Sequence, residues 1–144
     1  MSYTLDANVL LYASDEASPL HSRAREVVER MAVGHEIAYL FWPTIIAYLR
    51  LSTHPAIFAR PLSAVEAAGN IEQLIGRPHV HCPGEQDGFW RHYQEVSSDA
   101  APTGNLVSDA HLVALMLEND VRTIWTHDRD FRRFSTIEVR DPFE

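Results

Sequence analysis

Short apolar runs of strand length alternate along this chain with longer segments of helical period, and this alternation is the strongest constraint on its fold. Strands are expected at residues 3–5, 36–41, 79–82, 121–126 and 136–141. Helices are expected directly after Asp6 and at residues 19–32, 42–53, 62–75, 84–98 and 105–120, with Ser63 as an N-cap. This order predicts right-handed crossovers and a parallel sheet that is covered by helices on both faces.

The size and charge of the chain limit what it can be. Its 144 residues, 46% of them hydrophobic, suit one domain spanning residues 1–144. The net charge of −8 disfavours a broad electrostatic grip on nucleic acid but allows a local basic rim around an acidic pocket. The one cysteine, Cys82, excludes an intrachain disulfide, and no apolar run approaches the roughly 20 residues that span a bilayer. We therefore expect a cytoplasmic protein without a membrane segment.

Four aspartates fall where expected strands end or helices begin. Asp6 follows the first strand, and Asp128 and Asp130 follow the fourth in the stretch THDRDF. Asp109 lies in the first turn or so of the helix expected at residues 105–120, where the helix dipole favours a negative charge. Because functional groups of such sheets gather beyond the carboxyl ends of the strands, we expect these acids to converge.

Taken singly, each acid has a structural explanation: Asp6 as a helix cap, Asp109 as a first-turn charge and Asp128 as a turn residue. Three carboxylates in a partly dry cleft are different, because they repel one another unless a cation neutralises them or one takes up a proton. Oxygen-only ligands suit Mg²⁺ or Mn²⁺, and Mg²⁺ keeps waters that can be deprotonated for attack on phosphorus. The acids therefore indicate a site for a hard divalent cation.

Six stretches occur in a specific order: LDANVLLYA, HSRAREVVERM, WPTIIAYLRLSTHP, SDAHLVALMLEND, IWTHDRDFRRF and VRDPF. This set, which covers nearly the whole chain, resembles the PIN domains and, within them, the VapC-type toxins of bacterial toxin–antitoxin modules. The resemblance implies a three-layer α/β/α sandwich with a mostly parallel central sheet and Mg²⁺- or Mn²⁺-dependent endonucleolytic cleavage of RNA. It also implies homodimerisation and inhibition by a cognate antitoxin. The family's catalytic, metal-binding acids fall on Asp6, Asp109 and Asp128.

The chain departs from this family at one acidic position. PIN domains usually carry a glutamate in the helix after the second strand, where this chain has Ala47, or Tyr48 if the alignment is shifted by one residue. The departure removes a ligand for a second cation. Asp130 could replace that ligand by moving toward the site, and its alternative role is to cap the turn before Phe131.

Other residues are expected to support the site rather than to bind the cation. Asn8 matches the polar neighbour of the family's first acid, and Thr126 resembles its hydroxyl beside the last acid, so either could orient a carboxylate or water. A local basic excess near the site is expected to hold RNA phosphates. It consists of Arg50, His54, Arg129, Arg132 and Arg133. His127 is expected to point away from the site, because alternate side chains of an extended segment face opposite sides.

The expected function is that of a metal-dependent ribonuclease toxin, and two other classes of protein share some of these features. A phosphatase of the haloacid dehalogenase type or a receiver domain also places acids at strand ends. That class fits poorly, because LDANV lacks the second aspartate and the chain has no lysine. The remaining alternative is a non-catalytic PIN-fold module that binds antitoxin or RNA. Apolar residues around Trp42 and Phe58 are expected to form a homodimer surface.

Overall fold

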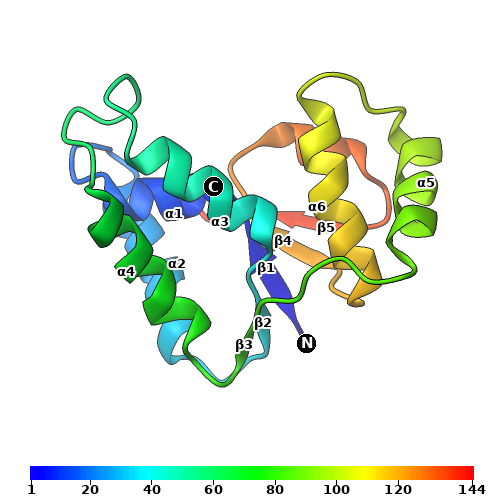
Figure 1. Ribbon diagram of the computed structural model, residues 1–144, viewed down its shortest axis with the longest axis horizontal. Coiled ribbons are helices and arrows are strands. Elements are labelled where there is room, and N and C mark those ends of the chain that lie inside the picture. Colours follow the sequence, from blue (N-terminus) through cyan, green and yellow to red (C-terminus); the bar gives the residue numbers. More distant parts are fainter.

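A computed structural model describes residues 1–144, and a five-stranded sheet forms its centre (Figure 1). All neighbouring strands are parallel, in the order β3-β2-β1-β4-β5. The strands are short: β1 (Tyr3–Leu5), β2 (Ala38–Tyr39), β3 (Val80–His81), β4 (Thr123–Trp125) and β5 (Glu138–Arg140). The helices are α1 (Ala7–Ser14), α2 (His21–Val33), α3 (Trp42–Ser52), α4 (Ala64–Ile75), α5 (Phe89–Ala100), α6 (Leu106–Glu118) and the 3₁₀ helix η1 (Arg129–Arg133).

Two hydrophobic cores lie against the sheet, and each is covered by its own group of helices. The first core joins β1 to α1, α2, α3 and α4, with Leu5 and Met31 fully buried in it. The second joins β4 to α5, α6 and η1, with Ile124 and Phe131 fully buried. Figure 1 shows α1 to α4 on one side of the molecule and α5 with α6 on the other. The expected three-layer α/β/α sandwich with a parallel sheet is therefore confirmed.

The elements follow the expected order but not every expected boundary. The capping box that Ser63 forms with Glu66 opens α4 as expected. The second strand is reduced to Ala38–Tyr39, because only those residues pair with β1. Helix α5 begins at Phe89, five residues later than expected, since the preceding segment runs as an irregular loop. The 3₁₀ helix η1 was not expected.

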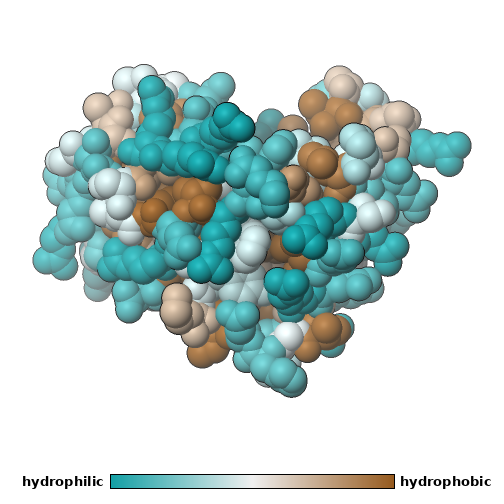
Figure 2. Space-filling view, turned by 180° about the vertical axis from the view of Figure 1, so that it is seen from behind, coloured by the Kyte–Doolittle hydropathy of each residue, from teal (hydrophilic) through white to brown (hydrophobic).

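Strand β1 occupies the middle of the sheet, between β2 and β4. The residues that follow β1 therefore lie next to those that follow β4 at the carboxyl edge of the sheet. Helix α1 starts directly after β1, and the segment after β4 runs into η1. The molecule seen from behind is hollowed between two lobes (Figure 2). None of the helices combines the length and the apolar character that a membrane-spanning helix requires.

Candidate metal centre

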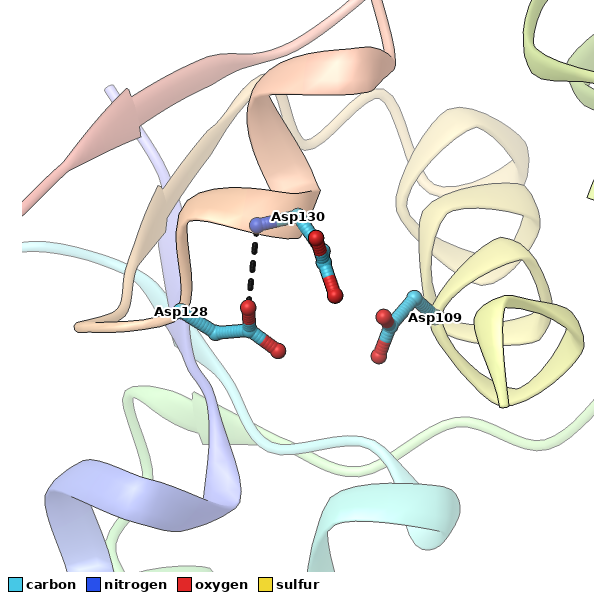
Figure 3. Close-up of side chains that lie close together, drawn as sticks. All are labelled: Asp109, Asp128 and Asp130. Atoms are coloured by element: carbon cyan, nitrogen blue, oxygen red, sulfur yellow. Dashed lines mark hydrogen bonds between the residues drawn. The ribbon is translucent and has the colours of Figure 1, made fainter.

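Three carboxylates from two separate segments meet at the carboxyl edge of the sheet. Oxygens of Asp109, Asp128 and Asp130 all lie within 4.8 Å of one another. Figure 3 shows Asp109 extending from α6 toward the other two, which belong to the segment entering η1. Asp128 is the N-cap of η1, and its Oδ1 accepts a hydrogen bond of 2.9 Å from the backbone N–H of Asp130. That bond fixes the two acids relative to each other and leaves Oδ2 of Asp128 free.

Asp109 has a strongly raised pKa. It lies in the first turn of α6, half-buried, where an acid is favoured by the helix dipole. Burial, followed by the charges of Asp6, Asp128 and Asp130, nevertheless raises the pKa of Asp109 to about 7. Burial and the neighbouring charges together outweigh the helix dipole. A cation is the simplest group that would relieve it.

Asp6 adjoins this group without being one of its three closest members. It is the N-cap of α1, and its Oδ1 accepts a bond of 2.7 Å from the N–H of Ala7. Its Oδ2 accepts from Thr126 Oγ1 at 2.8 Å and from Asn8 Nδ2 at 3.2 Å. Burial raises the pKa of Asp6 although these hydrogen bonds oppose the change. The same carboxylate of Asp6 therefore caps α1 and lies beside the three acids.

Thr126 and Asn8 connect Asp6 to the segment that carries the other acids. The buried Thr126 hydroxyl accepts from the backbone N–H of Asp128 at 3.0 Å and from Asn8 Nδ2 at 3.2 Å. Asn8 Oδ1 accepts from the backbone N–H of His127 at 3.4 Å. Thr126 and Asn8 are thus placed to orient Asp6 and the backbone of the segment that carries Asp128.

Helix α3 borders α1 and α6, and it has no acid to offer. Tyr48 is buried in the first core, and its hydroxyl bonds Ser14 at 2.7 Å and Asn70 at 3.0 Å. Ala47 is half-buried on another flank, one turn after Thr44, whose buried hydroxyl has no hydrogen-bond partner. Tyr48 therefore faces the core, whereas Ala47 lies on a partly exposed flank of α3.

The basic residues divide into two groups. Arg50 lies in the last turn of α3 and His54 follows that helix, so both are at the end of α3 remote from the sheet. Arg129 and Arg132 pair with Glu144 at 3.7 and 3.5 Å, while Arg133 is exposed at the end of η1. Only the arginines of η1 belong to the segment that carries the acids.

His127 makes a contact that the sequence did not reveal. Its Nδ1 lies 2.8 Å from Oδ2 of Asp141, which follows β5. The side chain does point away from the acids, as the alternation along an extended segment indicates. No spacing rule connects a histidine with an aspartate 14 residues later, and only the adjacency of β4 and β5 does so.

Comparisons with known proteins identify relatives of this chain. Residues 3–137 match the family model for the PIN domain. Ribonuclease VapC48 of Mycobacterium tuberculosis is 50% identical over 143 residues, which cover 99% of this chain and 99% of that protein.

Solved structures share the fold at low sequence identity. VapBC2 from Rickettsia felis, bound to a DNA fragment from its promoter, has a TM-score of 0.68 and 12% identity, covering 98% of each chain. VapC20 of Mycobacterium tuberculosis, described as a Sarcin-Ricin loop cleaving toxin, has a TM-score of 0.67 and 15% identity, covering 96% of this chain and 98% of that one.

Proposed function

This chain belongs to the PIN domain family, and we propose that it is a metal-dependent ribonuclease of the VapC type, the toxin of a toxin–antitoxin pair. The observation that carries the proposal is the convergence of Asp109, Asp128 and Asp130 at one edge of the sheet. Family membership supports the RNA substrate, and the acids support the dependence on a cation.

The donors at this edge fit a hard divalent cation. All are carboxylates, a ligand type that suits Mg²⁺ or Mn²⁺, and the pKa of Asp109 is raised by burial and then by the charges of the neighbouring acids. We propose that Asp109, Asp128 and Asp6 hold the cation and that Asp130 supplies the acid that Ala47 does not. When bound, the cation would lower the pKa of a water for attack on phosphorus and offset the charge of the phosphodiester.

The surrounding residues have separable roles in this proposal. Thr126 and Asn8 hold Asp6 and the backbone of Asp128 in place through their hydrogen bonds. Arg129, Arg132 and Arg133 lie on η1 beside the acids and can bind phosphates of the RNA strand. Arg50 and His54, at the far end of α3, would contact only a longer stretch of RNA.

The proposed function includes partners and a location. We propose that residues 1–144 form one PIN-like domain that homodimerises and is inhibited by a cognate antitoxin. A VapBC complex among the structures of the same fold supports the antitoxin. An RNA substrate and the single cysteine favour the cytoplasm.

The rival function is a non-catalytic PIN module that binds antitoxin or RNA without cutting. The absence of a glutamate at Ala47 favours this rival, and the presence of Asp130 in the acid group counts against it. The two functions differ in turnover, so cleavage of RNA in Mg²⁺ or Mn²⁺ distinguishes them.

The test compares Asp109→Asn and Asp6→Asn with the unaltered protein. We expect both variants to lose RNA cleavage and growth inhibition while they keep the circular dichroism spectrum of the fold. Asp120→Asn is the matched control, because Asp120 lies beyond the other end of α6 at φ 55°, which asparagine tolerates. Activity like that of the unaltered protein in a folded Asp109→Asn or Asp6→Asn variant would contradict the assignment.

A further inference from the structure

A histidine–aspartate pair stands directly behind the segment that carries two of the acids. His127 precedes Asp128, and its side chain turns away from the acids toward Asp141. Although His127 is partly exposed, the Asp141 side chain is only 3% exposed. A carboxylate buried to this degree needs partners for both oxygens.

Both oxygens of Asp141 have such partners. Oδ2 lies 2.8 Å from His127 Nδ1, and Oδ1 accepts a bond of 2.9 Å from the backbone N–H of Phe143. Because a carboxylate accepts, Nδ1 is the ring nitrogen that carries the hydrogen. The backbone near Asp141 is itself fixed, since Arg23 Nε donates to the carbonyl of Pro142 at 2.8 Å.

Aromatic contacts hold the imidazole in one orientation. Its ring meets that of Phe143 edge to face, with centroids 5.2 Å apart, and that of Tyr12 with centroids 6.3 Å apart. Tyr12 and Phe143 also contact each other edge to face at 5.5 Å. The ring is therefore attached to α1 on one side and to the segment after β5 on the other.

The segment with Asp128 and Asp130 is consequently held on two sides. Thr126 and Asn8 bind it from the side of Asp6, and the pair of His127 with Asp141 binds it from the opposite side. Without the second attachment, repulsion among the acids would move Asp128 away from Asp109 whenever no cation is present. A cation would then have to draw the segment back, which weakens binding.

We propose that His127 and Asp141 are positioning residues that keep Asp128 and Asp130 within reach of Asp109 for cation binding. The inference rests on the proposed function, because it concerns the same acids. Neither residue contacts the cation or the RNA in this proposal. Their effect is on the affinity for the cation rather than on the chemical step.

The test measures the dissociation constant for Mn²⁺ by calorimetry and the melting temperature in EDTA, with RNA cleavage as a third readout. Asp141→Asn keeps the size of the side chain but leaves one oxygen for two donors. His127→Phe keeps the ring and removes the donor, whereas His127→Asn keeps a donor near the position of Nδ1. Glu85→Gln is the matched control, because Glu85 accepts from His111 at 2.6 Å in a second histidine–carboxylate pair.

We expect Asp141→Asn and His127→Phe to weaken Mn²⁺ binding by about 10-fold, as is typical of groups that orient metal ligands. His127→Asn should restore most of the affinity, and Glu85→Gln should leave it unchanged. A lower melting temperature with an unchanged Mn²⁺ affinity would show that the pair only stabilises the fold, and would overturn the inference alone. An unaltered protein that neither binds Mn²⁺ nor cuts RNA would overturn the proposed function, and this inference with it.

Discussion

Asp109 illustrates how one side chain can respond to pH through its neighbours. Its pKa in the folded protein is about 7, whereas the ordinary value is 3.8. The folded state therefore binds a proton more tightly than the unfolded state does. The contribution to stability is complete below the ordinary pKa and is lost as the pH rises through about 7.

We predict that the cation-free protein melts at a lower temperature at about pH 8 than at about pH 5, and that Asp109→Asn reduces this difference. Mn²⁺ affinity should change in the opposite direction, because a carboxylate ligand must be deprotonated. Thermal melts in EDTA and Mn²⁺ titrations at both pH values measure the two effects. An Asp109→Asn variant with the full pH dependence of the unaltered protein would assign the effect to other groups.

Thr126 is the residue whose hydroxyl connects most of the site. We predict that Thr126→Val lowers the free energy of unfolding by about 1–3 kcal/mol, because Asp6 loses a donor and the N–H of Asp128 loses its acceptor. Thr126→Ser keeps the hydroxyl and should cost less. Urea unfolding of both variants measures the difference, and equal losses would indicate that the methyl group, not the hydroxyl, is important.

Sequence reasoning placed each acid at a strand end or helix start, but it could not rank their distances. Asp6 is the most recognisable acid, yet it lies outside the closest group because capping α1 and bonding Thr126 fix its orientation. Asp130, although exposed, enters that group because η1 directs it toward Asp109 (Figure 3), and η1 was not expected from the sequence. Local sequence patterns indicate at which strand end or helix start a residue lies. The orientation of its side chain depends on hydrogen bonds to residues that are distant in the sequence.

At the scale of elements, α3 is the helix whose surface decides how complete the site is. Tyr48 is 1% exposed and is bonded to two helices, so a charge there would be buried without a partner. Ala47 is half-buried, so a longer side chain there would have access to solvent, and we expect it to extend toward the acids.

We predict that Ala47→Glu lowers the Mg²⁺ or Mn²⁺ concentration for half-maximal cleavage by roughly 10-fold, because affinity for hard cations follows the number of charged ligands. Tyr48→Glu is the comparison, and it should lower the melting temperature instead. Metal titrations of cleavage and thermal melts of both variants measure these outcomes. An unchanged metal dependence in a folded Ala47→Glu variant would show that this flank of α3 does not border the cation.

The order and type of the elements followed from apolar periodicity, but their ends did not. Ser63 could be identified because a capping box has a local signature, serine followed three residues later by glutamate. The ends of β2 depend on which residues pair with β1, and the start of α5 depends on the loop before it. Pairing between segments far apart in the chain leaves no local signature of this kind.

At the scale of the whole molecule, exposed apolar side chains favour one surface for self-association. Trp42 and Ile46 are four residues apart on α3, so they share a face, and they are 43% and 56% exposed. Phe58 is itself 5% exposed, whereas its neighbour Ile57 is 53% exposed, so the expected surface around Phe58 would be formed by its neighbours. Figure 2 also shows the hollow between the two lobes, seen from behind.

We predict that the protein is a dimer at tens of micromolar by light scattering and that Ile46→Glu yields a monomer, since a buried unpaired charge is costly. Val65→Glu is the control, because Val65 on α4 is 83% exposed and lies outside this surface. A monomeric unaltered protein, or an equal response to both substitutions, would contradict a dimer through α3.

The central place of β1 affects the timing of synthesis. Its partners β2 and β4 are translated far apart in time. The hydrogen bond of Asp6 with Thr126 and the approach of Asp109 to Asp128 can form only after the later residue of each pair has been translated. A nascent chain that has not yet released residues 123–140 from the ribosome lacks two strands and two of the four acids. Because domains fold as units once their distant contacts can form, we expect the acid group to assemble abruptly when residues 123–140 become available. A ribosome that stalls before residue 123 would thus carry a chain without the assembled acid group.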